Sequence, residues 1–259
     1  MDRRPGPATP GLLAALLVLL LAGCAVGGAP RTSGTRRTSR SAGSSIVALG
    51  DSVPAGSACD CTPYPQLSAT ELSPADGPTV AARNDAVGGF TTDDVLQQLG
   101  GAGSVVKDVT GADLVEVQVG ANDVGHSDAC GTDVACYRPA VPVVRENLDD
   151  IVARVHHLAD GHPVRVVLLD YWSVWLGGRY AQAQGEAYVD AAAAVTDEVN
   201  TTIREVAAQT GSAYVDLRAA FKGPDYSYDE THYLAPDGDH PNAAGHQKIA
   251  AALVQVVEG

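Results

Sequence analysis

Short apolar runs rich in β-branched residues alternate along this chain with longer segments of helical spacing. This alternation constrains the fold more than any other feature. Five runs read as strands, at residues 45–50, 78–84, 112–120, 162–170 and 212–217; the first is consistent with burial on both faces, and the second has the weakest pattern. Helical patterns fall between and after them, at residues 93–99, 143–159, 184–209 and 242–257. Strands that alternate with helices predict one parallel sheet covered by helices on both faces.

The first 44 residues lack this pattern and read as a targeting segment. Two arginines precede an uncharged apolar run at 11–23, which is typical of a secretory signal peptide and shorter than the ~20 apolar residues of a membrane span. The run ends in Leu-Ala-Gly before Cys24, a sequence that resembles a bacterial lipobox. We therefore expect a lipoprotein signal peptide at 1–23 and a lipid on Cys24; the alternative is an ordinary signal peptide with an unrelated cysteine.

Residues 24–44 are rich in Gly, Ser, Thr and Arg, which predicts a flexible tether between the lipidated cysteine and a single domain at 45–259. Such a protein would be exported and held at the outer face of the cell membrane as a lipoprotein, or secreted. We expect it to be a monomer.

Charge is distributed unevenly between the two parts. The chain has 17 basic and 31 acidic residues, a net charge of −14. Six of the basic residues and one acidic residue precede Ser45, so the domain holds 11 basic against 30 acidic residues, a net charge of −19. A domain this acidic repels a phosphate backbone, which argues against a nucleic-acid partner.

Four cysteines remain in the domain: Cys59, Cys61, Cys130 and Cys136. An even number in an exported domain indicates two disulfides, for which three pairings exist. Cys130 with Cys136 closes a short loop, whereas Cys59 with Cys61 makes a cramped ring, so cross-pairing between the two loops stays open. A zinc site is the other alternative; it is disfavoured because no histidine has ligand spacing, and we expect no metal.

Polar residues suited to acyl transfer follow the predicted strands. Ser52 comes after the first strand and Asn122 after the third, while Asp237 and His240 precede the last helix. A serine hydroxyl needs a base such as histidine, the imidazole needs a carboxylate on its other nitrogen, and the oxyanion needs fixed donors. Because the carboxyl ends of parallel strands meet at one edge of a sheet, we expect these residues to lie together.

Four sequence blocks carry a resemblance to a known family. They are Gly50-Asp51-Ser52 with Gly56, the loop 84–92 with Gly89 near its end, Gly120-Ala121-Asn122-Asp123, and Asp237-Gly238-Asp239-His240. In this order they resemble the SGNH hydrolases, also called GDSL-type esterases and lipases, over nearly the whole domain.

The resemblance implies a flavodoxin-like three-layer α/β/α sandwich with a five-stranded parallel sheet, and ester hydrolysis without a cofactor. It implies Ser52 as nucleophile, His240 as general base and Asp237 as the residue that orients it. The oxyanion hole would combine the Ser52 N–H, the Gly89 N–H and the Asn122 amide. Gly88 is the alternative to Gly89, because the two glycines are adjacent.

The resemblance leaves the reaction partly open. Hydrolysis of acyl or acetyl esters of lipids or glycans through an acyl-enzyme on Ser52 is the leading hypothesis. An O-acyltransferase acting on cell-envelope glycans or lipids would use the same residues, and a non-catalytic surface binding module is a third possibility. The segment after the fourth strand holds Tyr171, Trp172 and Trp175, which we expect to form a substrate wall.

Overall fold

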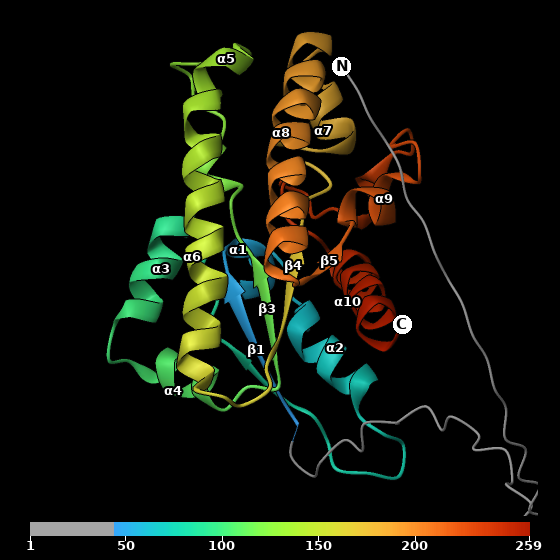
Figure 1. Cartoon of the computed structure of the whole chain (residues 1–259). Coiled ribbons are helices and arrows are strands. Elements are labelled where there is room, and N and C mark those ends of the chain that lie inside the picture. Colours follow the sequence, from blue (N-terminus) through green and yellow to red (C-terminus); the bar gives the residue numbers. More distant parts are fainter. Residues whose placement is uncertain (1–43) are drawn as a thin grey trace, which may run out of the picture. The chain divides into compact units, whose positions relative to one another are not determined.

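The computed structural model describes residues 44–259, so the predicted signal peptide, Cys24 and nearly all of the tether lie outside the described residues. Five strands form one sheet: β1 (Ser45–Gly50), β2 (Ala81–Asn84), β3 (Leu114–Gln118), β4 (Arg165–Leu169) and β5 (Ala213–Val215). All pairings are parallel and the order is β2-β1-β3-β4-β5 (Figure 1), which confirms the predicted fold class.

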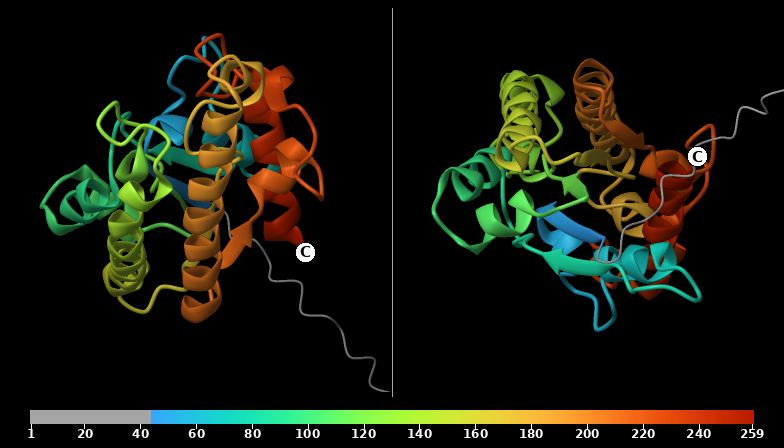
Figure 2. Two further views of the ribbon diagram at one scale, coloured as in Figure 1. Left: turned by 90° about the horizontal axis from the view of Figure 1, so that it is seen from above. Right: turned by 60° about the horizontal axis from the view of Figure 1, so that its bottom comes forward.

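Helices cover both faces of the sheet. On one face α3 (Thr92–Gly100), α4 (Ser104–Thr110), α6 (Val141–Ala159) and α8 (Glu186–Thr210) pack against one another. On the other face α2 (Tyr64–Leu72) packs against α10 (Ala243–Glu258), beside α9 (Leu217–Lys222). Both views of Figure 2 show α6 and α8 side by side. No helix within residues 44–259 is long and apolar enough to cross a bilayer.

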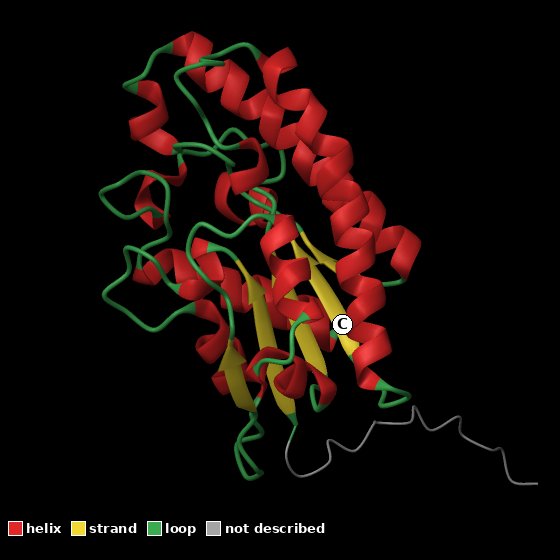
Figure 3. Cartoon of the chain, turned by 90° about the vertical axis from the view of Figure 1, so that its left-hand side faces the viewer, coloured by secondary structure: helices red, strands yellow, loops and turns green. Residues whose placement is uncertain are grey.

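Short elements gather at one end of the sheet. They are α1 (Ser52–Ala55), the 3₁₀ helix η1 (Asn122–Val124), α5 (Val134–Tyr137), the 3₁₀ helix η2 (Arg138–Ala140), α7 (Gly178–Gln182) and the 3₁₀ helix η3 (Glu230–Tyr233). Figure 3 shows helices that extend beyond the ends of the strands. The helices and short elements at this end can therefore form walls around a site at the strand ends.

Local sequence explains where several elements begin and end. Thr91 caps α3 through a complete capping box with Asp94, and Gly211 ends α8 with φ +71°. The buried side of α6 repeats at helical spacing, as the sequence predicted. β1 spans the predicted residues. The other four strands are shorter than predicted, because the flanking residues of each run belong to the turns that enter and leave the sheet.

The cysteines pair within their own loops. Cys59 bonds to Cys61 and Cys130 to Cys136, with Cα–Cα distances of 5.1 and 5.7 Å, both within the usual range for disulfides. Cross-pairing between the loops does not occur in this structure.

The sheet also buries an acid at its centre. Glu116 on β3 is fully buried; one carboxylate oxygen accepts a hydrogen bond from the Ser68 hydroxyl and the other has no partner. Burial raises the pKa of Glu116 to about 8, against the lowering effect of the Ser68 hydrogen bond. The folded protein therefore binds this proton more tightly than the unfolded chain, and the stability it contributes is lost as the pH rises from about 5 to about 8.

Replacing Glu116 by glutamine removes this titration. Between pH 5 and pH 8 we expect the free energy of unfolding of Glu116→Gln to fall by about 3 kcal/mol less than that of the unsubstituted protein. Urea denaturation at both pH values measures the difference. Glu71→Gln, on the exposed side of α2, is the matched control and should follow the unsubstituted protein. Parallel pH profiles for Glu116→Gln and the unsubstituted protein would contradict the expectation.

Candidate active site

The turn after β1 presents Ser52 at the carboxyl edge of the sheet. Gly50 has φ +143°, and a side chain there would place Cβ 1.9 Å from the backbone oxygen of Gln118 on β3. The Asp51 N–H donates to that same oxygen at 3.1 Å. Ser52 then begins α1, so the close approach of β1 to β3 sets the position of the serine.

Asp51 holds this turn from inside the protein. Its side chain is buried and accepts hydrogen bonds from the Val53 N–H at 3.0 Å and from the Tyr171 hydroxyl. Burial raises the pKa of Asp51 to about 7, against the lowering effect of these two hydrogen bonds. Because both oxygens are engaged, Asp51 supports the loop and ties it to the segment after β4.

The loop after β2 is pinned against the same turn. The Val87 N–H donates to the Gly50 carbonyl at 3.0 Å, and the Asn84 amide donates to the Pro54 carbonyl at 2.7 Å. These two hydrogen bonds hold the following residues, Gly88 and Gly89, beside Ser52.

The two glycines differ in their surroundings. A side chain on Gly88 would place Cβ 3.9 Å from the Cβ of Ser52, whereas one on Gly89 would meet nothing within 4 Å. Gly89 instead has φ +86°, a backbone conformation that disfavours other residues. Neither feature identifies the oxyanion donor, and the choice of Gly89 stays a prediction.

Asn122 follows β3 and leans toward this loop. Its amide donates to the Phe90 carbonyl at 2.9 Å, which leaves its second N–H without a partner among the hydrogen bonds of the described residues. The neighbouring Asp123 accepts from the Thr92 N–H at 3.0 Å and from the Thr92 hydroxyl at 2.6 Å. Asp123 thus fixes the loop and Asn122 faces the open space.

His240 is held from its Nδ1 side. Asp237 Oδ2 lies 2.7 Å from this nitrogen, and Asp237 Oδ1 accepts from the His240 N–H at 3.1 Å. Partial burial would raise the pKa of Asp237, but hydrogen bonds from His240 and the Asp239 N–H lower it below its ordinary value. An ionised carboxylate at Nδ1 favours the tautomer with its proton there, leaving Nε2 as an acceptor.

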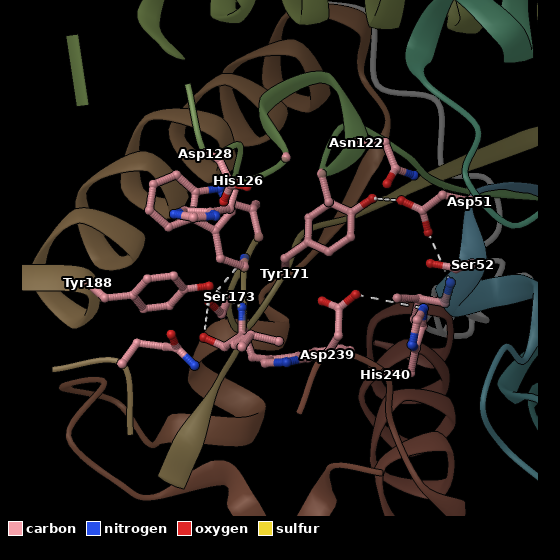
Figure 4. Close-up of a pocket in the computed structure, with 18 residues that line it drawn as sticks. Asp51, Ser52, Asn122, His126, Asp128, Tyr171, Ser173, Tyr188, Asp239 and His240 are labelled. Carbon is pink, nitrogen blue, oxygen red and sulfur yellow. Dashed lines mark hydrogen bonds and ion pairs between the residues drawn. The ribbon is translucent and has the colours of Figure 1, made fainter. Parts of the chain in front are cut away.

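These residues meet in one cavity of about 460 Å³ (Figure 4). Ser52, Asn122 and His240 all line it, and Asp237 supports the imidazole from behind. The cavity lies between the carboxyl ends of β1 and β3, where the chain order of the sheet reverses, and this is where ligands bind in open α/β sheets. Gly89 is not among the lining residues.

The predicted aromatic wall is present but almost entirely buried. Tyr171, Trp172 and Trp175 line the cavity, yet each is at most 3 % exposed. Trp172 stacks on Phe221, and the Trp175 indole N–H donates to the Val124 carbonyl at 2.8 Å. They shape the wall and leave little of their own surface for contact.

Five further residues line the cavity but were not among the predicted site residues: His126, Asp128, Gln184, Tyr188 and Asp239. His126 contacts both Trp175 and Tyr188, with ring centroids 4.9 and 5.1 Å apart. Tyr188 lies in an Ala-rich helix whose pattern marks only its packing face, so the sequence held no signal for it. His126 follows Asn122 in the same loop, and that proximity was the available clue.

One cluster resembles a metal site. Cys59, Cys61 and the buried His246 place candidate ligand atoms within 4.8 Å of one another. His246 Nδ1 accepts a hydrogen bond from the Tyr64 N–H at 3.2 Å, so the imidazole proton lies on Nε2, where a metal would need a lone pair. The two sulfurs are joined in a disulfide. These residues therefore do not fit a metal ion.

Comparisons with known proteins agree with this geometry. A family model described as GDSL-like lipase/acylhydrolase matches residues 48–248. No curated protein matches the chain significantly in sequence. Many solved structures match.

Three of these solved structures illustrate the likeness. Phospholipase A1 from Streptomyces albidoflavus is 26% identical with a TM-score of 0.59, and the alignment covers 82% of this chain and 99% of that one. An extracellular lipase from Streptomyces rimosus is 24% identical with a TM-score of 0.62 and the same coverage. A lipase from a goat rumen metagenome is 17% identical with a TM-score of 0.65, covering 83% and 98%.

Proposed function

Because the chain belongs to the GDSL-like lipase/acylhydrolase family, we propose that it hydrolyses carboxylic esters through an acyl-enzyme on Ser52. The observation that supports this most directly is the His240–Asp237 pair, bonded at 2.7 Å in a cavity that Ser52 also lines. A serine, an imidazole and an orienting carboxylate are the parts of acyl-transfer catalysis by a hydroxyl nucleophile.

The proposed reaction has two halves. His240 Nε2 takes the Ser52 proton as Oγ attacks the ester carbonyl, and the resulting oxyanion receives hydrogen bonds from the Ser52 N–H, the Gly89 N–H and the Asn122 amide. Collapse of this intermediate breaks the bond to the alcohol, which leaves with the proton from His240. Water, deprotonated by His240, then attacks the acyl-enzyme and releases the acid.

A serine-directed phosphonate tests the nucleophile. We expect the purified protein to gain one phosphonyl group and lose esterase activity in parallel, with the adduct on the peptide that contains Ser52. An adduct on another serine, or activity that survives complete labelling, would refute the proposal.

The Asn122 amide provides a second test. Because it would donate to charge that develops only in the transition state, Asn122→Ala should lower kcat on the order of 10²–10³-fold with a smaller change in KM. Asn147→Ala, whose amide bonds to the Thr92 hydroxyl behind the loop, is the comparison. A larger loss of kcat in Asn147→Ala than in Asn122→Ala would argue against a direct role for Asn122.

We further propose that the protein is exported and anchored to the membrane through a lipid on Cys24. The support is the leader at 1–23, with its basic start, apolar run and lipobox-like end. Mass spectrometry of the N-terminal peptide from the membrane fraction tests this, since an unmodified Cys24 would exclude the anchor.

A further inference from the structure

The active-site cavity is strongly acidic. Asp51, Asp128 and Asp239 line it, and among the described residues that line it there is no lysine or arginine. Both oxygens of Asp51 are engaged by Val53 and Tyr171. The charges available to a bound molecule are therefore those of Asp128 and Asp239.

Nearby basic side chains are directed elsewhere. Arg218 and Lys222 line a neighbouring cavity on the other side of Trp172 and Leu176, not the one with Ser52. Each pairs with its own carboxylate: Arg218 with Asp197, and Lys222 with Glu230. They do not offset the negative potential in the active-site cavity.

Asp239 lies beside the imidazole nitrogen that would serve the leaving alcohol. Its Oδ2 is 3.9 Å from His240 Nε2 (Figure 4), whereas Asp237 contacts the other ring nitrogen, Nδ1. The Asp239 carboxylate is half-exposed. Under the proposed function this Nε2 returns the proton to the departing oxygen. An alcohol that accepts that proton lies within a few ångströms of the Asp239 carboxylate.

Aromatic rings form the wall of the cavity opposite Ser52. His126, Trp175 and Tyr188 contact one another across the cavity from Ser52, beside Asp128 (Figure 4). The two carboxylates favour cations by direct attraction, while Trp175 and Tyr188, each at most 7 % exposed, shape the wall without offering a ring face.

We propose that Asp239 makes this enzyme selective for esters of positively charged alcohols, such as amino or quaternary ammonium alcohols, over neutral and anionic ones. This rests on the proposed function, because it assigns the alcohol to the His240 side of the cavity. Since Asp239 is half-exposed, its charge should change relative rates about two- to fivefold and not by orders of magnitude.

Three acetates of similar size provide the test: acetylcholine, its uncharged isostere 3,3-dimethylbutyl acetate, and the anionic 3-acetoxypropane-1-sulfonate. All three pass through the same acetyl-enzyme, so their kcat/KM values differ only in steps that involve the alcohol. We expect kcat/KM to fall in the order cation, neutral, anion, and the cation-to-neutral ratio to shrink as salt is raised from 20 mM to 500 mM.

Variants separate the role of Asp239 from intrinsic ester reactivity. Asp239→Asn should reduce the cation-to-neutral ratio about two- to fivefold, and Asp239→Glu should retain most of it. Any effect of Asp239 on the basicity of His240 alters both esters alike and cancels in the ratio. Asp76→Asn removes the same charge from an exposed loop outside the cavity and should leave the ratio unchanged.

The outcomes also separate this inference from the proposed function. If the neutral acetate is cleaved in a Ser52-dependent manner but the ratio is insensitive to salt and to Asp239→Asn, the selectivity is refuted and the esterase stands. If no acetate is cleaved and Ser52 takes no phosphonate, the proposed function itself fails. A misfolded Asp239→Asn variant leaves the salt dependence of the unsubstituted protein to decide.

Discussion

Ser52→Ala is expected to reduce kcat/KM for ester hydrolysis on the order of 10⁴–10⁶-fold. Removal of the hydroxyl eliminates the covalent intermediate, and what remains is the contribution of the oxyanion donors and substrate binding. Initial rates with a short-chain nitrophenyl ester measure it, with the variant purified separately so that traces of unsubstituted enzyme do not set the floor.

Two comparisons make that loss interpretable. Ser104→Ala, an exposed serine at the start of α4, should retain full activity. His240→Ala should be about as inactive as Ser52→Ala, and the double variant no worse than either, because nucleophile and base act as one unit. Additive losses would mean that the two residues do not share a mechanism.

Gly50→Ala is expected to lower the free energy of unfolding by about 4 kcal/mol or more, the upper end for single substitutions. The added Cβ would sit 1.9 Å from the backbone oxygen of Gln118, which belongs to the centre of the sheet and cannot move aside. Positive φ at this position adds strain. Separation of β1 from β3 would be the only relief, and it would also displace Ser52.

Urea denaturation of Gly50→Ala beside Gly100→Ala tests the argument. Gly100 ends α3, and a side chain there would meet nothing within 4 Å, so its replacement should be neutral or stabilise by up to about 1 kcal/mol. If both variants unfold within 1 kcal/mol of the unsubstituted protein, the tight turn before Ser52 is not sterically determined.

Much of the fold could be read from local pattern. The strands β1, β3 and β4 and the helices α3, α6, α8 and α10 were all predicted within a few residues of their ends. The helix α2 was not predicted; it begins at Tyr64 between two prolines and buries a mixed set that includes Ser68 and Ala69. A buried helix face made of small and polar residues carries little hydrophobic periodicity, so only its packing against α10 reveals it.

Part of the site could be read in the same way. Glycine, aspartate and serine at the end of a strand, and the Asp237–His240 spacing, are local features, and the i,i+3 separation already brings the carboxylate to the imidazole. The cavity walls were harder to predict, since Tyr188 and His126 come from separate elements that meet only in the folded chain. The disulfide pairing likewise depended on how far apart the fold places the two cysteine loops.

Local sequence specifies the parallel sheet and the residue types at its carboxyl edge, because strand burial, turn chemistry and helix caps are encoded over a few neighbouring residues. Which of those residues line one cavity depends on how distant segments pack. The order β2-β1-β3-β4-β5 opens a crevice between β1 and β3, and Ser52, Asn122 and His240 reach it from distant parts of the chain. Gly50 shows both contributions. The local sequence predicts a turn there, and the Gln118 backbone oxygen on the neighbouring strand explains why no larger residue fits.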